Sequence, residues 1–264
     1  MSEEPPVQAN FDQIMSSVAD LNKQHITSLY VPSVNDYVNF KPMTVKQQKK
    51  IISSSMDTKI QNLTFSNTIN DIILENCLES KSKIKLTDKI LLLLQLRAKS
   101  QGDELIVTGE SGQYTINLPK HIENIIEQSN NHQTHEFEIE VENLKVSGST
   151  PNLTRDTHFN KQFTKTVSKY TDNTLGLTDM VGDIYIHEMV KYVDSINIGD
   201  LTVMMDNYEV SQTIEVFENL PMSVSTQIAE KIKHLRKIEI LSVEHDDLPD
   251  DVQIPIDATL FTSG

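Results

Sequence analysis

Cysteine is almost absent from this sequence, which excludes two kinds of stabilising site. Cys77 is the single cysteine, so an internal disulfide and a zinc site with several cysteine ligands are both excluded. A chain that needs no disulfide fits a reducing compartment. We expect Cys77 to be an ordinary core thiol, because it shares a helical face with Ile69, Ile72 and Ile73.

Long hydrophobic runs are also missing. Spanning a bilayer takes roughly 20 consecutive apolar residues, whereas the densest apolar run, Ile90–Leu94, is far shorter. The first residues, Met1–Pro6, are acidic and lack the apolar segment of a secretory signal. We therefore predict no membrane association, and we expect the protein to remain where it is made.

Basic residues are few relative to acidic ones. The chain has 23 Lys and Arg against 38 Asp and Glu, a formal net charge of −15. Non-specific nucleic-acid binding depends on clustered Lys and Arg that neutralise phosphates, so we predict no nucleic-acid partner and expect protein partners instead. An alternative stays open here, in which the acidity serves only solubility.

The most informative local pattern is a hairpin followed by a helix start. Leu29–Val31 and Tyr37–Phe40 favour strands, and Pro32–Asp36 supplies turn-forming residues between them. Thr44 and Gln47 then match a capping box, in which the hydroxyl accepts a hydrogen bond at the helix N-terminus and the amide reaches back. A β-hairpin and a capped helix are therefore predicted in immediate succession.

Helical periodicity occurs in two regions before residue 102. Apolar residues recur at helical spacing from Phe11 to Leu21, and we interpret this stripe as packing against its own domain in preference to docking on a neighbouring subunit. Residues 44–101 are expected to form a compact unit of three helices. Ile90–Leu94 makes the last of these apolar around most of its circumference, which is typical of a helix in the middle of a core.

The period of the hydrophobic pattern changes after Gly102. Gly109–Gly112 lies between two β-prone runs and indicates a hairpin. Residues 136–142 alternate glutamate with apolar side chains, as in a half-buried strand with a solvated acidic face. A boundary is expected at residues 147–152, and beyond it the pattern is helical again apart from a strand or hairpin around Gly199.

Together these patterns predict an α+β protein with a mainly helical core, an N-terminal β-hairpin and an inserted β-hairpin lobe. Helices of residues 44–101 are expected to pack with those of residues 177–236, while the hairpins of residues 103–147 project as a separate lobe. The predicted units are an N-terminal arm and amphipathic helix (1–28), a hairpin plus helical core (29–101), a β-rich lobe or insertion (102–150), and a helical C-terminal part with an extended docking tail (151–264).

No histidine pattern meets the spacing that a metal site requires. His187 and Glu188 begin like the H-E-x-x-H motif on a helix, but Lys191 occupies the position of the second histidine. His132 and His135 lack further ligands in the sequence around them. Both histidine patterns are therefore interpreted as accidental.

Two further patterns also fail as functional sites. Ser111 lies in a strand–turn–strand context and lacks the Gly-x-Ser-x-Gly pattern of a nucleophile elbow. The aspartates of the C-terminal acidic run lack the alternating spacing and central glycine of a calcium loop; they are Asp246, Asp247, Asp250 and Asp251. We therefore predict no catalytic residue, no cofactor and no metal, and we predict that the protein is not an enzyme.

Two blocks of sequence carry a resemblance to a known family. The N-terminal block contains Tyr30–Pro32, Asn39–Pro42 and Thr44–Lys50, and the C-terminal block contains Val216–Pro221 and Ile254–Phe261. In this order they resemble the baseplate hub proteins of T4-like contractile-tailed bacteriophages (myoviruses). Residues 102–168 show no such resemblance, which indicates an insertion peculiar to this chain.

The resemblance implies a structural subunit of the baseplate hub, which acts through contacts with other phage baseplate and hub proteins. A non-virion assembly factor, or chaperone, for the hub is the alternative within the same family, and a homo-oligomer is left open. The implied location is the host cytoplasm during assembly and then the virion tail baseplate. A metal-dependent hydrolase is retained as a remote alternative from another functional class.

The C-terminal segment is the one predicted partner-binding element. Its apolar side chains are Val252, Ile254, Ile256, Leu260 and Phe261, and the first three alternate with polar residues and proline. Pro255 lacks an N–H and so favours an edge position in a sheet, as expected of a strand that docks on another protein. The alternative is that the segment folds back on its own helices. Because the resemblance extends through this segment, we expect a role in assembly.

Overall fold

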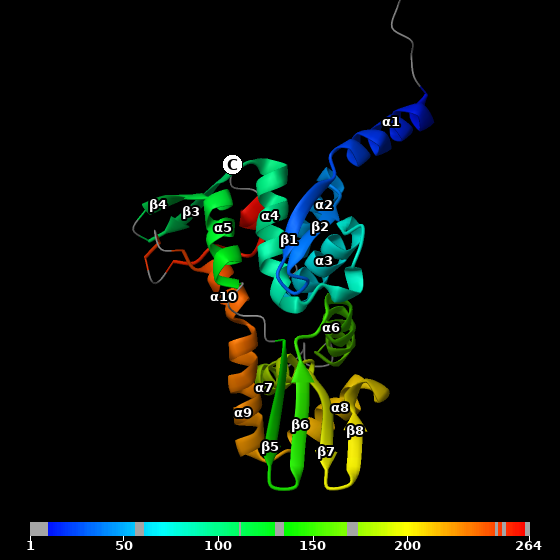
Figure 1. Ribbon diagram of the computed structural model, residues 1–264, viewed down its shortest axis with the longest axis vertical. Coiled ribbons are helices and arrows are strands. Elements are labelled where there is room, and N and C mark those ends of the chain that lie inside the picture. Colours follow the sequence, from blue (N-terminus) through cyan, green and yellow to red (C-terminus); the bar gives the residue numbers. More distant parts are fainter. Residues whose placement is uncertain are drawn as a thin grey trace, which may run out of the picture.

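The structure divides along its long axis into an upper, mainly helical part and a lower part built around a four-stranded sheet (Figure 1). The computed structural model describes residues 10–55, 61–110, 112–129, 135–167, 174–245, 248–249 and 252–261. The predicted α+β class is confirmed. Within these residues, no helix is both long enough and apolar enough to cross a bilayer.

The predicted N-terminal hairpin is confirmed. β1 (Thr27–Val31) and β2 (Asp36–Phe40) pair in antiparallel fashion. Asn35 adopts a positive φ of 54° in the turn, a conformation that Asn tolerates better than most residues. The backbone of Tyr30 exchanges two hydrogen bonds of 2.9 Å with the side-chain amide of Gln95. The hairpin is thereby attached to the central helix of the upper part.

The three helices expected in residues 44–101 are present. α2 (Val45–Ser55) begins at the predicted capping box, in which the N–H of Thr44 donates to Oε1 of Gln47 at 3.0 Å and the N–H of Gln47 donates to Oγ1 of Thr44 at 3.3 Å. α3 (Gln61–Asn76) packs against α2. Cys77, which follows α3, is buried as expected of a core thiol.

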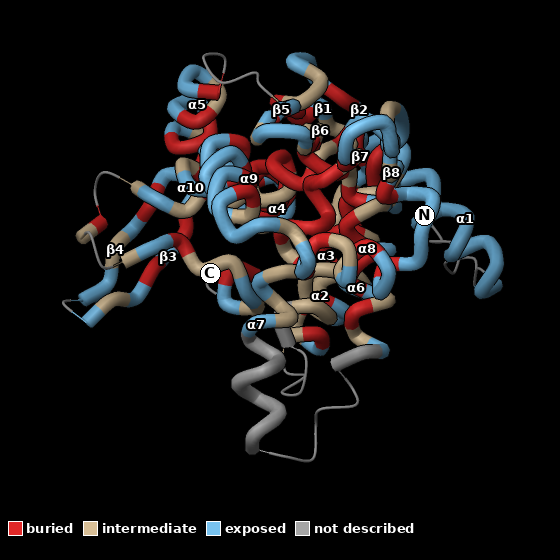
Figure 2. Tube along the Cα trace, turned by 90° about the horizontal axis from the view of Figure 1, so that it is seen from below, coloured by how far each residue is buried: buried red, intermediate tan, exposed pale blue. Residues whose placement is uncertain are grey.

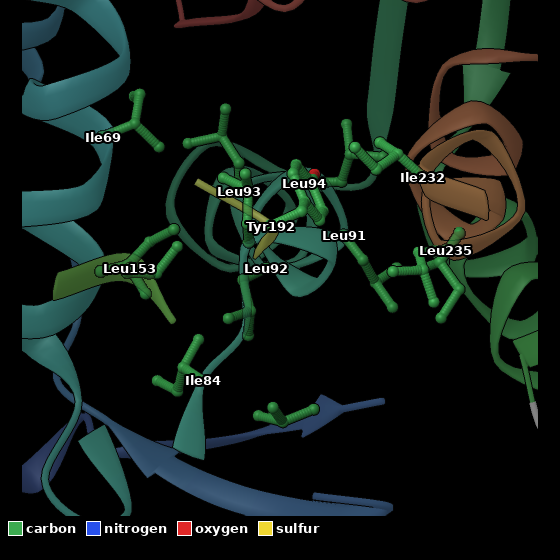
Figure 3. Close-up of a cluster of buried hydrophobic side chains, with 14 of the residues drawn as sticks. Ile69, Ile84, Leu91, Leu92, Leu93, Leu94, Leu153, Tyr192, Ile232 and Leu235 are labelled. Atoms are coloured by element: carbon green, nitrogen blue, oxygen red, sulfur yellow. The ribbon is translucent and has the colours of Figure 1, made fainter. Parts of the chain in front are cut away.

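The third helix, α4 (Lys89–Gln101), is central to the core. It follows two short 3-10 helices, η1 (Lys81–Lys83) and η2 (Leu86–Asp88). Leu91–Leu94 are all fully buried. Figure 3 shows why: the leucines project from α4 in different directions, Leu93 on the side of Ile69 in α3 and Leu91 on the side of Leu235 in α9 (Met222–Leu235). The four consecutive leucines of α4 therefore have packing neighbours in several directions.

A second hairpin flanks α4 in the upper part. β3 (Glu104–Gly109) pairs with β4 (Gly112–Asn117), and α5 (Leu118–Ser129) and α10 (Lys237–Val243) pack beside α4. Arg97 is buried at this junction, where its Nη1 donates to the carbonyl of Gly102 at 2.6 Å and its Nη2 to the carbonyl of Glu104 at 2.9 Å. Arg97 thus satisfies carbonyl groups at the end of α4 and the start of β3.

The lower part is an antiparallel sheet with strand order β5–β6–β7–β8. Its strands are β5 (Glu136–Val141), β6 (Leu144–Ser149), β7 (Val193–Ile198) and β8 (Leu201–Met204), and η3 (Met205–Asn207) follows the last of them. Ile139, Val146 and Ile196 pair across the sheet on its buried face. On the other face Lys145 pairs with Glu138 at 3.0 Å and with Glu140 at 3.4 Å, which confirms the predicted acidic, solvated side of β5.

Four helices lie beside the sheet or between it and the upper part (Figure 1). They are α6 (Leu153–Val167), α7 (Thr174–Val190), α8 (Val210–Glu218) and α9. α9 contacts β5, whereas α6 contacts α3 of the upper part. Gly148 of β6 is required by close packing, since a Cβ atom there would lie 2.3 Å from the ring of Phe137 and 2.4 Å from the carbonyl oxygen of Tyr192.

The prediction that the hairpins of residues 103–147 project as a separate lobe is wrong for the second hairpin, formed by β5 and β6. Among the described residues β3 and β4 form a two-stranded sheet, but β5 and β6 continue into one sheet with β7 and β8. The hydrogen-bonding edge of β6 needs a partner, and β7 supplies it from 193–198. The hairpin of residues 136–149 therefore belongs to the same structural layer as a segment beyond α7.

The expected packing of the N-terminal stripe against its own domain is also wrong. α1 (Phe11–Gln24) forms as predicted, but none of its side chains is buried. Figure 1 shows α1 projecting away from the upper part, and Figure 2 shows it exposed along its length at the edge of the molecule. The periodicity indicated the helix correctly, but it could not indicate which chain covers the stripe.

Candidate functional site

A cluster of charged side chains is buried between the two parts of the molecule. Asp156 of α6 lies at its centre and is fully buried. Its carboxylate accepts hydrogen bonds from Nζ of Lys191 and from Nδ2 of Asn70, both at 2.7 Å. Nζ of Lys89 lies 3.8 Å from the same carboxylate, and Lys191 also pairs with Glu188 at 2.7 Å. The cluster therefore ties α3, α4 and α6 to the end of α7.

The electrostatics of the cluster favour a permanent ion pair. Burial alone would raise the pKa of Asp156, but Lys191 and Lys89 hold that pKa well below its usual range. Burial would likewise lower the pKa of Lys191, but Glu188 and Asp156 raise it. Lys89 shares the carboxylate with Lys191, and burial lowers the pKa of Lys89. Asp156 and Lys191 are thus both charged at neutral pH.

His187 lies beside this cluster and is neutral at pH 7. Its ring stacks on Phe163 with centroids 4.3 Å apart, and its Nε2 lies 3.2 Å from Oδ1 of Asn160. That oxygen only accepts, so Nε2 carries the proton and Nδ1 does not. Nδ1 is buried and has no hydrogen-bond partner within the described part of the chain. Burial lowers the pKa of His187 to about 4.

A cavity of about 420 Å³ opens beside the cluster. Leu93 and Ile256 contribute to its apolar wall, and Lys89, Arg236 and Glu239 to its polar wall. The charges on this wall are paired: Nε of Arg236 lies 2.7 Å from Glu239, and Lys89 lies near Asp156 and donates to Ser66 at 2.7 Å. Because these charges are already compensated, the cavity suits an apolar group better than a free ion.

The geometry of the cluster is that of a structural tie between helices. A general base works best with a pKa near the working pH, whereas the pKa values of Asp156 and His187 are shifted well below neutrality. Across the ranges that the structure describes, no three His, Cys, Asp or Glu side chains are grouped so that they could hold a metal. Lys191, which replaces the second histidine of the H-E-x-x-H pattern, is a member of the ion pair instead.

The other candidate site residues named from the sequence lie away from this cluster or outside the described residues. His135 is half-buried, and its carbonyl accepts a hydrogen bond from Thr150 at 2.8 Å. The remaining candidates lie outside the described residues; they are Ser111, His132, Asp246, Asp247, Asp250 and Asp251.

The predicted docking tail is folded back on its own chain. Ile254, Leu260 and Phe261 are buried, the last two in the 3-10 helix η4 (Ala258–Phe261). The N–H of Ile254 donates to the carbonyl of Val243 at 2.8 Å. Val252 and Ile256 are half-buried. Of the two alternatives, folding back describes this geometry, and partner binding by the segment remains a prediction.

The buried cluster was missed from the sequence. The one available signal is that Asp156 and Asn160 share a helical face with Phe163, which places polar residues in an otherwise apolar stripe. Such a face predicts burial with a polar partner, but the partners come from helices that are distant in sequence. Lys89 and Asn70 therefore could not be identified.

Comparison with known proteins identifies a family. The profile of a family described as "T4 bacteriophage base plate protein" matches residues 23–244. No curated protein matches the chain, and no solved structure does.

Proposed function

Because this chain belongs to the T4 bacteriophage base plate protein family, we propose that it is a structural component of the baseplate hub of a contractile-tailed phage. The observation that carries the proposal is the match over residues 23–244, which spans both the helical core and the sheet. Of the stretches that resemble hub proteins, Tyr30–Lys50 and Val216–Pro221 lie inside this range, whereas Ile254–Phe261 lies outside it. A baseplate protein acts through contacts with other baseplate proteins.

The physical character of the chain is consistent with this proposal. Buried charges tie its helices together, as in the ion pair between Asp156 and Lys191. The apolar stripe of helix α1 is exposed and available for contact. We propose that the chain assembles in the host cytoplasm and is retained in the tail of the phage.

Within the C-terminal segment, the half-buried residues Val252 and Ile256 are best placed to contact a partner without unfolding of the segment.

Quantitative mass spectrometry of purified tails tests the proposal. A hub subunit is expected as a fixed number of copies per tail, and native mass spectrometry of the isolated chain would reveal a homo-oligomer. A chain that is absent from finished tails but without which no baseplates form would be an assembly factor, the alternative role within the family. Normal tails from infections that lack the chain would contradict both roles.

A further inference from the structure

α1 carries an apolar stripe that the rest of the described chain leaves uncovered. The exposed fractions of its side chains are 74% for Phe11, 50% for Ile14, 50% for Met15, 43% for Val18 and 52% for Leu21. Side chains of these sizes expose on the order of 500 Å² together. A stripe of this extent is comparable to the largest apolar patch of a typical monomer, which is often functional.

Several interactions within α1 stabilise its helical structure locally. Asn10 and Gln13 form a complete capping box, with hydrogen bonds of 3.0 Å and 2.8 Å. Lys23 pairs with Asp20 at 2.9 Å one turn along the polar face. Asp12 in the first turn and Lys23 in the last complement the helix dipole. These features favour a helix formed before it meets a partner, which lowers the ordering cost of binding.

We propose that α1 is a docking helix for a different protein, which offers an apolar groove bordered by basic residues. This inference deepens the proposed function and rests on it. Residues 23–244 match the family, so most of α1 lies outside the matched region. The spacing i, i+3, i+4, i+7 and i+10 of the stripe is that of a helix that inserts one face into a groove.

Two arguments favour a different protein over a second copy of this chain. α1 spans 14 residues, or two heptads, whereas a coiled coil needs about three to four. Two facing stripes would bury at most about 1,000 Å², below the roughly 1,200 to 2,000 Å² of a stable specific interface. A groove encloses the helix from three sides and adds contacts beyond the stripe.

Besides the small size of the helix, its charge also favours a different protein and defines the chemistry of that partner. Each copy carries a net charge of −15, so two copies repel one another at long range. Within α1 the acidic residues Asp12 and Asp20 outnumber Lys23, the one basic residue of the helix. Charge complementarity therefore calls for Lys and Arg beside the groove.

Binding to baseplate assemblies tests the inference. The probe is the set of baseplate intermediates purified from cells infected with phage that cannot make this chain, and the labelled full-length protein is added to them. Replacing Ile14 and Val18 with Gln should weaken binding at least tenfold. Ser16→Gln on the polar face is the matched control and should bind normally. All three proteins should keep the same Tm, because α1 has no buried side chains.

The outcomes separate this inference from the proposed function. Raising salt from about 0.05 to 0.5 M should weaken wild-type binding, and salt-independent binding would overturn the basic border. Normal binding by the Ile14→Gln/Val18→Gln variant would overturn the docking role of α1 while leaving the baseplate role intact. Failure of the wild-type protein to bind any intermediate would count against the proposed function itself. If the isolated chain forms a dimer that requires the stripe, the stripe binds a second copy of the chain. If the chain binds phosphatidylglycerol vesicles through the stripe, the stripe binds a lipid surface. Either result would overturn docking on a different protein.

Discussion

Arg97 in α4 donates a hydrogen bond of 3.1 Å from its Nε to the carbonyl oxygen of Leu260, which lies 163 positions further along the chain. The next carbonyl, that of Phe261, accepts from Gln48 at 2.8 Å and from Gln101 at 2.9 Å. Three polar side chains of the helical core thus hold the backbone of the C-terminal segment. The segment behaves as a piece of the core.

Deletion of residues 252–264 should therefore destabilise the fold. Ile254, Leu260 and Phe261 would no longer be buried, and each contributes about 1.5 to 3 kcal/mol. The free energy of unfolding from urea titration should fall by several kcal/mol, or the chain should fail to fold. Deletion of residues 262–264 alone is the control and should have little effect. An unchanged urea midpoint in the longer deletion would show that the segment is not part of the core.

Replacing Asp156 with Ala should be strongly destabilising. The change leaves Lys191 and Lys89 buried without their shared carboxylate, and breaking a buried pair from one side costs about 3 to 5 kcal/mol. Asp20→Ala, which removes the exposed pair with Lys23, should cost less than about 1 kcal/mol. Equal effects of the two changes on the urea midpoint would contradict the central place of Asp156.

His187 should make the protein less stable as the pH falls. Its pKa is about 4 in the folded state and about 6.5 in an unfolded chain. Between these values the unfolded state binds more protons, so the stability present above pH 6.5 is lost as the pH falls towards 4. His187→Gln can keep the hydrogen bond to Asn160 without titrating. Between pH 7 and pH 4.5, the free energy of unfolding of the wild type should fall by about 2 to 3 kcal/mol more than that of the variant.

Titration of Asp88 should have the opposite effect on stability over much of the same pH range. Burial raises its pKa to about 6, although Ser33 and Lys85 donate hydrogen bonds to it. The folded state then binds more protons than the unfolded state between about pH 4 and 6, so this contribution is lost as the pH rises through 6. Asp88→Asn removes this titrating carboxyl group. The free energy of unfolding should then fall more steeply as the pH decreases into the acidic range. A variant with the same pH profile as the wild type would show that Asp88 does not titrate in this range.

Replacing Leu93 with Asp should unfold the protein. Leu93 is fully buried. The substitution would place an unpaired carboxylate in the core, where its burial is costly. Cys77→Ala removes only a small buried thiol and should be far milder. Thermal unfolding followed by circular dichroism measures both, and a Leu93→Asp variant with the parent Tm would contradict the position of α4 in the core.

The elements that could be predicted from the sequence are those with local causes. The turn after Val31, the capping box of Thr44 and Gln47, and the apolar circumference of α4 each depend on residues close together in the chain. α10 was missed because it follows α9 almost without a break, with Arg236 ending one helix and beginning the other. No gap in the periodicity marks that junction.

The features that could not be predicted depend on residues far apart in the chain. The pairing of Val146 with Ile196 joins segments separated by α6 and α7, and either strand alone has the same alternation whatever its neighbour. Asp156 meets Asn70 and Lys191 for the same kind of reason. The stripe of α1 is identical whether its own domain or another protein covers it.

The pairing of β6 with β7 also sets the order in which the lower part can form during translation. β6 ends at Ser149 and β7 begins at Val193, and at about 5 to 20 residues per second the ribosome needs on the order of 2 to 9 s to synthesise the interval. Throughout that delay the nascent chain carries β6 as an unprotected strand edge, which is a template for pairing with other chains. Slower elongation across α6 and α7 would prolong this vulnerable period, so the yield of soluble protein should depend on codon choice in that interval more than in the helical N-terminal half.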